Sequence, residues 1–247
     1  MKQTTFSKKS LIDFLAEIQG NPEDCLTVYI TPSSFRRSIS DLLETLPFAN
    51  EVAEAFGTEA VFREAQRYGT GLVIFWSERK NRLFVLPPFT VPEDKVVQGR
   101  PHTMPLCDAL QRERTVGFVL VTWGSYALGV FQGDNLVESK IGTGYIHKPH
   151  RKGGRSQKRF ARRTEEQKKD FLRKVANRTE ERFRAYPLEQ VFFGGNRLIL
   201  KPLLQECPYL GSQVDRISKR LLTVRYADRE ALLGSLEDVY RSLVFSF

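Results

Sequence analysis

The sequence predicts an α/β protein with two domains in its 247 residues. Short apolar runs rich in β-branched and aromatic side chains alternate with stretches in which apolar residues recur at helical spacing. Turn residues separate these stretches, and the composition, with 41% hydrophobic and 27% charged residues, is that of a globular protein. A chain of this length can bury two separate hydrophobic cores.

Residues 1–98 are predicted to form an N-terminal α/β domain. Apolar residues at helical spacing over residues 7–19 predict a helix that ends at Gly20. The run LTVYI at residues 26–30 is β-branched and aromatic, which is typical of a strand. The remaining elements predicted in this domain are helices at residues 36–46 and 48–68 and strands at residues 71–76, 82–86 and 92–97.

Residues 99–114 contain two prolines and one glycine and show no sustained period, so they are predicted to be a linker or crossover. The second domain, residues 115–247, opens with three strands joined by the turn pairs Gly124-Ser125 and Gly133-Asp134, which favours an antiparallel meander. The three strands are predicted at residues 115–123, 126–131 and 135–141.

A capping box at residues 164–167 predicts the start of a helix over residues 164–186. The elements predicted after it are a strand at residues 190–193, a helix at 196–206, a strand at 221–224 and a helix at 229–245. This order, βββαβαβα, is that of a ribonuclease H-like mixed sheet with flanking helices.

The formal charge of +9 is concentrated in one segment. Residues 147–163 hold eight Lys/Arg and no acid, whereas the rest of the chain has 30 Lys/Arg against 29 Asp/Glu. Neighbouring charges of one sign repel each other, so this cluster of cations indicates an anionic partner such as RNA. The alternative is a solvated loop with incidental charge. The eight cations are Lys148, Arg151, Lys152, Arg155, Lys158, Arg159, Arg162 and Arg163.

The predicted loop at residues 142–163 is too polar and too rich in glycine to be core. Its glycines permit backbone angles that other residues avoid, so we expect it to reach outward. At its tip, Gln157 places a neutral amide among cations. A glutamine is neither a strong acid or base nor a strong metal ligand, so any chemistry here would come from positioning water and substrate. The glycines of this loop are Gly142, Gly144, Gly153 and Gly154.

These motifs resemble those of the Vms-like release factors, the VLRF family, which are relatives of the catalytic middle domain of eukaryotic and archaeal class I release factors. The resemblance covers about residues 115–247 and rests on a GxxQ motif at residues 154–157, the Tyr145 and His147 pair before it, and the basic run at residues 158–163. It implies a release-factor middle-domain-like fold. The release factors themselves carry Gly directly before Gln, whereas Arg155 and Ser156 precede Gln157 here.

The resemblance implies a factor that binds a ribosome or large ribosomal subunit, inserts the loop into the peptidyl transferase centre and frees the nascent chain from peptidyl-tRNA, as in ribosome rescue and quality control. Gln157 would coordinate the attacking water or the terminal adenosine, and Gly153 and Gly154 would let the backbone approach the ester. The implied catalytic residues are Gly153, Gly154, Ser156 and Gln157. The residues implied to contact rRNA and tRNA are Tyr145, His147, Lys148, His150, Arg151, Lys152, Arg155, Lys158, Arg159, Arg162 and Arg163.

The sequence and the resemblance also bear on alternative functions. A metal-dependent nuclease on this fold needs a carboxylate on the first strand, and TVGFVLVTW has none. The HxxH formed by His147 and His150 contains Pro149 and has no nearby Cys or carboxylate, so we expect no metal and no cofactor. A non-catalytic module that binds ribosomes or RNA stays open, and so does a tRNA 3′-end endonuclease.

The chain shows no apolar run of the roughly 18 residues that a membrane span needs. Its N-terminus has no small-residue cleavage site, and its three cysteines are far apart without a CxxC motif. We therefore expect a cytoplasmic protein with no membrane partner and with buried thiols. The sequence leaves open the partner of the N-terminal domain, which would be a ribosomal protein, a tRNA body or a second copy. It also leaves the oligomeric state open.

Overall fold

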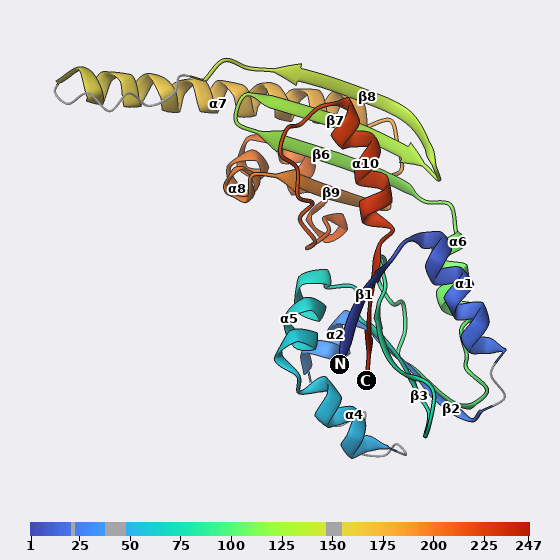
Figure 1. Cartoon of the computed structure of the whole chain (residues 1–247). Coiled ribbons are helices and arrows are strands. Elements are labelled where there is room, and N and C mark those ends of the chain that lie inside the picture. Colours follow the sequence, from blue (N-terminus) through green and yellow to red (C-terminus); the bar gives the residue numbers. More distant parts are fainter. Residues whose placement is uncertain (21–22, 38–47, 147–154) are drawn as a thin grey trace. The chain divides into compact units, whose positions relative to one another are not determined.

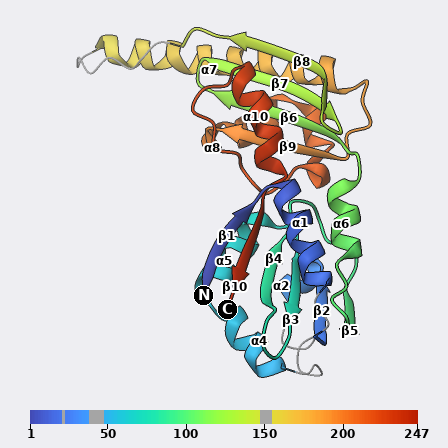
Figure 2. The ribbon, with the colours of Figure 1, turned by 45° about the vertical axis from the view of Figure 1, so that its right-hand side comes forward.

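The computed structural model describes residues 1–20, 23–37, 48–146 and 155–247, with the side chains of residues 155–158 excepted. The chain divides into two compact units, drawn in Figures 1 and 2. Unit 1 comprises Met1–Arg112 and Glu237–Phe247, and unit 2 comprises Glu113–Leu236. The predicted α/β class is confirmed. The C-terminal residues from Glu237 onward belong to unit 1, whereas the sequence placed them in the second domain.

Unit 1 is built on an antiparallel sheet with the strand order β1-β10-β4-β3-β2-β5. Every residue of β2 and β3 is buried, because helices cover both faces of the sheet. The strands are β1 (Lys2–Phe6), β2 (Cys25–Ile30), β3 (Leu72–Trp76), β4 (Arg82–Leu86), β5 (Lys95–Gly99) and β10 (Ser242–Ser246).

Alternate residues of the strands in unit 1 pack against different helices. Leu11 of α1 and Leu106 of α6 share one hydrophobic cluster with Val73, while Val52 of α4 shares the other with Ile74. Each face of the sheet is therefore covered by its own set of helices, because successive side chains along a strand point to opposite faces. The helices are α1 (Lys8–Gln19), α2 (Pro32–Arg37), α4 (Ala49–Phe56), α5 (Glu59–Tyr68) and α6 (Met104–Gln111).

Several expectations for unit 1 were wrong. The predicted linker at residues 99–114 contains helix α6, whose Leu106 and Leu110 are buried in the core. The predicted helix at residues 229–245 ends at Val239, and the chain continues as strand β10 between β1 and β4. The predicted helix at residues 48–68 is broken between α4 and α5. Most of the predicted helix at residues 36–46 lies outside the described residues.

Unit 2 contains a mixed sheet with the order β8-β7-β6-β9. The predicted antiparallel meander is confirmed, and Gly124 and Gly133 take positive φ angles of 97° and 56° in its two turns. Strand β9 then pairs in parallel with β6. The strands are β6 (Thr115–Thr122), β7 (Ser125–Gln132), β8 (Asn135–Thr143) and β9 (Gln190–Gly195).

Helices flank both faces of this sheet. Val175 of α7 and Leu203 of α8 share a buried cluster with Val121 of β6. On the opposite face Leu232 of α10 lies so close to Gly129 that an added Cβ atom would be 2.8 Å from its side chain. The helices are α7 (Arg155–Phe183), α8 (Arg197–Glu206), α9 (Pro208–Gly211), the short η1 (Val214–Arg216) and α10 (Arg229–Val239).

The mixed sheet with flanking helices is therefore confirmed, but its predicted last strand is reduced. Residues 221–224 form no regular strand; Leu222 makes a single parallel bridge to Gly194, and Ile217 makes another to Val191. Both bridges lie along β9 at the edge of the sheet. Among the described helices, none is long and apolar enough to cross a membrane.

Candidate functional site

Helix α7 is 29 residues long, and its described buried side chains all lie in its C-terminal part. Its buried stripe begins at Phe171 and continues through Val175 to Phe183, and none of residues 159–170 is buried. At a rise of about 1.5 Å per residue, residues 155–170 extend about 24 Å along the helix axis. Figures 1 and 2 show this part of α7 continuing past the ends of the strands. We call residues 155–170 the α7 arm.

The predicted start of this helix at Thr164 was wrong. α7 begins at Arg155, and the Thr164 hydroxyl donates to the carbonyl oxygen of Phe160 at 3.0 Å, which is an interior and not a capping arrangement. The preceding run RSQKRFARR has no Gly or Pro and is rich in good helix formers. Strand β8 also continues to Thr143, so the predicted loop at residues 142–163 is mostly strand and helix in its described part.

The predicted site residues fall into three groups. The first turn of α7 is formed by Arg155, Ser156, Gln157 and Lys158. The predicted positions Arg159, Arg162 and Arg163 follow on the arm, and Tyr145 is 74% exposed just after β8. The predicted residues outside the described part of the chain are His147, Lys148, His150, Arg151, Lys152, Gly153 and Gly154.

Cations dominate the described part of the arm. Arg162 Nε lies 3.0 Å from Glu166 Oε1, and Lys168 Nζ lies 2.6 Å from Glu165 Oε1. Such pairs three or four residues apart support a solvated helix by about 0.3 kcal/mol each. Arg159 and Arg163 are exposed one turn apart and form no ion pair with any described residue. They are therefore available to an anionic partner.

The root of the arm is held against the sheet by aromatic packing. The Phe171 ring lies 6.4 Å from the Trp123 ring and 6.1 Å from the Tyr126 ring, measured between centroids. Lys168 Nζ stands 5.2 Å from the centre of the Trp123 ring, a cation–π contact. Lys174 Nζ donates to the carbonyl oxygen of Thr143 at 3.0 Å, which ties α7 to the end of β8.

Gly142 and Gly144 were expected to supply unusual backbone angles, but neither has a positive φ. They are required by close packing instead. An added Cβ at Gly144 would lie 2.4 Å from Phe171 Cδ2, and one at Gly142 would lie 2.4 Å from the Tyr126 hydroxyl. Burial raises the pKa of the Tyr126 phenol, so this group stays protonated near neutral pH. These glycines let α7 pack directly on the strands.

Unit 2 contains a second basic stretch, which is not among the predicted site residues. Residues 216–229 hold five Lys/Arg and one acid, a local excess that the balanced total outside residues 147–163 conceals. Within this stretch Tyr226 is 69% exposed and Arg225 is exposed beside it. A charge count over a short sliding window, in place of the chain total, is the signal that could have found it.

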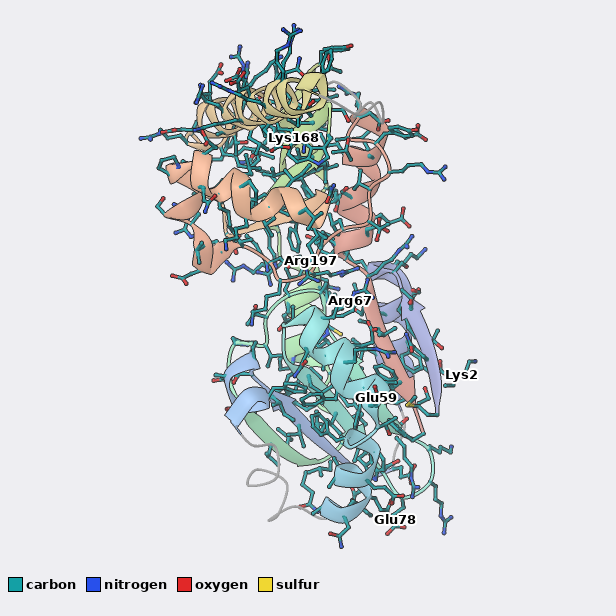
Figure 3. All side chains as sticks on the ribbon, turned by 90° about the vertical axis from the view of Figure 1, so that its left-hand side faces the viewer. Lys2, Glu59, Arg67, Glu78, Lys168 and Arg197 are labelled. Atoms are coloured by element: carbon teal, nitrogen blue, oxygen red, sulfur yellow. The ribbon has the colours of Figure 1, made fainter. Side chains whose placement is uncertain are left out.

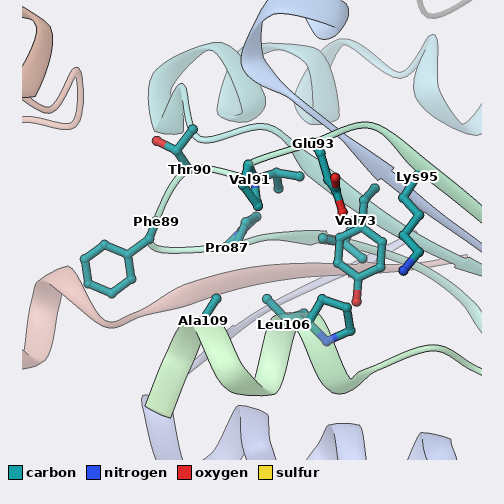
Figure 4. Close-up of a pocket in the computed structure, with 12 residues that line it drawn as sticks. Val73, Pro87, Phe89, Thr90, Val91, Glu93, Lys95, Leu106 and Ala109 are labelled. Carbon is teal, nitrogen blue, oxygen red and sulfur yellow. The ribbon is translucent and has the colours of Figure 1, made fainter. Parts of the chain in front are cut away.

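Unit 1 contains a small apolar cavity of about 40 Å³, shown in Figure 4. Pro87 and Val91 line one side, and Leu106 and Ala109 of α6 line the other. Tyr29 also lines the cavity; it donates its hydroxyl to the carbonyl oxygen of His102 at 2.7 Å, and burial raises the pKa of this phenol. Within the described residues no group of three or more His, Cys, Asp or Glu is arranged to hold a metal ion.

Residues 114–244 match the model of a protein family described as Actinobacteria/chloroflexi VLRF1 release factor. The chain is 31% identical over 129 residues to eukaryotic peptide chain release factor subunit 1 of Oxytricha trifallax, which covers 51% of the chain and 27% of that protein. It is 37% identical over 78 residues to the same factor of Stylonychia lemnae, covering 32% and 18%.

A solved structure of an archaeal translation termination factor aligns over 95% of the chain and 73% of its own length, with 19% identity and a TM-score of 0.35. The chain spans about a quarter or less of the length of the curated relatives named above. The family match, in contrast, extends over just over half of the chain and contains the whole α7 arm. The chain belongs to the Actinobacteria/chloroflexi VLRF1 release factor family.

Proposed function

We propose that this protein is a ribosome-associated release factor that frees nascent chains from peptidyl-tRNA, with the α7 arm as the part that enters the peptidyl transferase centre. The observation that carries the proposal is the arm itself. A helical stretch of about 24 Å whose described side chains, at residues 159–170, are not buried adds nothing to the core of unit 2, yet it can carry a short motif into a confined site. Its first turn contains Gln157, the last residue of the GxxQ motif.

The charge of the arm fits a partner made of RNA. Arg159 and Arg163 are exposed and form no ion pair with described residues. Arg162 forms an ion pair with one exposed glutamate, Glu166. Contacts from such residues to phosphates position a protein without reading sequence. In this proposal they bind rRNA and tRNA phosphates of the large ribosomal subunit, together with Lys148, Arg151, Lys152, Arg155 and Lys158 and with Tyr145, His147 and His150.

The proposed reaction is hydrolysis of the ester that joins the nascent chain to the 3′-terminal ribose. The water oxygen forms a bond to the ester carbonyl carbon, the bond from that carbon to the ribose oxygen breaks, and the ribose oxygen leaves as a hydroxyl with a proton from the water. A primary amide offers a donor and an acceptor but no proton at neutral pH, so Gln157 would orient the water. Gly153, Gly154 and Ser156 would set the backbone around it.

Two observations leave the identity of the broken bond to experiment. Arg155 and Ser156 stand before Gln157, where the release factors carry glycine, so the motif alone does not specify the peptidyl ester. The same basic arm would also suit cleavage of a phosphodiester near the tRNA 3′ end. Because a carboxylate is absent from β6, metal-assisted cleavage of the kind that needs one there is not the route proposed.

The test uses the purified full chain and ribosome complexes that carry a labelled nascent peptide on tRNA. The released peptide is measured, and the 3′ end of the recovered tRNA is sequenced. The proposal expects free peptide and a tRNA with its complete 3′ end. Peptide that is still joined to a short 3′-terminal tRNA fragment, together with a tRNA body that lacks its 3′ end, would establish the endonuclease. Binding without cleavage of either bond would establish the non-catalytic module, and each result would overturn the proposal.

A further inference from the structure

The segment at residues 222–227 crosses the ends of three strands in unit 2. At its start Leu222 bridges Gly194 of β9, and its carbonyl oxygen accepts from the backbone N–H of Gly195 at 3.1 Å. At its end the backbone N–H of Ala227 donates to the Ser125 hydroxyl at the start of β7 at 3.3 Å. Strand β6 ends between them, where the backbone N–H of Asn196 donates to the carbonyl oxygen of Val121 at 3.1 Å.

The same end of the sheet is where the α7 arm departs. The carbonyl oxygen of Gly124, in the turn between β6 and β7, accepts from the backbone N–H of Gly144 at 2.9 Å. Trp123, the residue before it, packs on Phe171 at the first buried position of α7. Figure 1 shows the arm leaving this end of the sheet, with α8 beginning at the same end. The crossing segment therefore lies at the root of the arm.

Four exposed side chains collect on and beside this segment. Leu222 and Gly194 form a bridge between two parallel segments of the chain. Arg225 lies three residues after Leu222, and Arg197 lies three residues after Gly194, so the two arginines follow the same bridge on neighbouring segments. Tyr226 follows Arg225 and is 69% exposed, and Arg229 begins α10. We call Arg197, Arg225, Tyr226 and Arg229 the arm-root surface. Figure 3 marks its position with Arg197, and marks α7 with Lys168.

The cations of the arm-root surface are not neutralised within the described chain. Arg197, Arg225 and Arg229 form no ion pair with described residues. The acids nearest to these arginines in sequence are Asp228 and Glu230. The Asp228 carboxylate already accepts from the backbone N–H of Ala231 at 2.8 Å as a helix cap. Three exposed arginines without an ion pair to described residues, on or beside a segment that also carries an exposed tyrosine, indicate an anionic partner that also has flat apolar faces.

We propose that the arm-root surface is a second RNA-binding site, which takes unpaired nucleotides with one base stacked on Tyr226 and the flanking phosphates on the three arginines. This proposal rests on the proposed function only in taking RNA as the partner. A base in a duplex is already stacked on both faces, whereas an unpaired base can stack on a tyrosine. An acidic peptide would satisfy the arginines but would leave the ring of Tyr226 exposed.

The test measures binding of a fluorescently labelled 12-nucleotide single-stranded RNA to the full chain by anisotropy at several salt concentrations. To separate this site from the arm, each variant is also made in a background with Arg159, Arg162 and Arg163 changed to Gln. Tyr226→Ala should weaken binding about tenfold in both backgrounds, because stacking of one base is worth about 1–3 kcal/mol. Tyr226→Phe should bind like the parent, since it keeps the ring.

The arginine double variant, Arg225→Gln with Arg229→Gln, should reduce the slope of log K against log salt by about 1.4, or about 0.7 for each lost phosphate contact on a single strand. Arg184→Gln is the matched control, because it removes an exposed arginine that pairs with Glu180 near the other end of α7, and it should leave both affinity and slope unchanged. An unlabelled duplex of equal charge should compete poorly, and so should polyglutamate.

The proposal is overturned if Tyr226→Ala and the arginine double variant both bind like the parent, or if duplex or polyglutamate competes as well as the single strand. The RNA probe carries no peptidyl ester, so these outcomes do not depend on peptide release. If the protein does not release peptide but Tyr226→Ala weakens RNA binding as expected, this site stands and the proposed function fails. If the protein releases peptide fully but neither Tyr226→Ala nor the arginine double variant changes RNA binding, this site alone is refuted.

Discussion

The two parts of helix α7 are continuous in the backbone but are stabilised differently. From Phe171 to Phe183 the helix buries a stripe of apolar side chains against the sheet of unit 2. The α7 arm, residues 155–170, has no buried side chain in its described part and relies on helix propensity and on pairs such as Arg162–Glu166. Folding stability and the proposed contact with RNA thus belong to different parts of one helix, which predicts that they can be changed separately.

The largest effect on stability is expected from Phe171→Ala. This substitution empties a buried site that contacts Trp123 and Tyr126 and should lower the free energy of unfolding by about 3–5 kcal/mol. The matched change on the arm is Phe160→Ala, at a side chain that is 42% exposed, and it should cost less than about 1 kcal/mol. The free energy of unfolding of both variants is measured by urea denaturation. Equal decreases in the two variants would mean that the arm is packed against the protein.

A smaller effect is expected from Gly144→Ala. The added methyl group would lie 2.4 Å from Phe171, so the root of the arm must shift, at a cost of about 1–3 kcal/mol. Gly234→Ala is the control, because it lies within α10 with no atom within 4 Å of the added Cβ and should stabilise the protein by up to about 1 kcal/mol. In thermal denaturation the midpoint temperature should therefore fall for Gly144→Ala and rise for Gly234→Ala. A shift of both midpoints in the same direction would contradict close packing at Gly144.

The smallest effect on stability, with a large effect on binding, is expected when Arg159, Arg162 and Arg163 are all replaced by Gln. The free energy of unfolding should change by less than about 0.5 kcal/mol, since these side chains are exposed. The slope of log K for ribosome binding against log salt should fall by about 2 to 3, as expected for the loss of three phosphate contacts. Unchanged affinity and slope in sedimentation assays would remove the arm from the RNA interface.

Local patterns predicted the elements whose stability is local. The meander β6–β7–β8 was predicted because its turns contain Gly124 and Gly133, which take the positive φ angles those turns need. The helix predicted at residues 196–206 is confirmed as α8, and the Asn196 side chain accepts from the backbone N–H of Leu198 at 2.9 Å as its cap.

Two of the errors occurred where distant segments decide the structure, and a third had a local cause. Strand β10 continues an apolar pattern that is also compatible with a helix, and its strand conformation depends on pairing with β1 and β4 from the other end of the sequence. Residues 221–224 read as a strand but reach the sheet only through the bridge at Leu222. The helix start at Thr164 was wrong because a capping box can also occur inside a helix, where propensity on both sides outweighs it.

The segment that holds the predicted site residues has a different local structure from the one that the sequence suggested. The basic run and Gln157 are visible in the sequence, yet the sequence suggested a loop where Arg155 to Arg163 form a helix. The arm-root surface was missed because Arg197 and Arg225 are distant in sequence, and the chain segments that carry them are joined by the bridge between Gly194 and Leu222.

The central claim is that the cations of the arm bind the ribosome while Gln157 at its first turn serves the chemistry. The most direct test compares Gln157→Ala with Gln132→Ala, which makes the same change at an exposed residue at the end of β7. Both variants should bind ribosomes like the parent, because no cation is removed. Release of labelled peptide from peptidyl-tRNA should fall about a hundredfold or more for Gln157→Ala and stay unchanged for Gln132→Ala. Full release by the Gln157 variant, or equal losses in both variants, would contradict the claim.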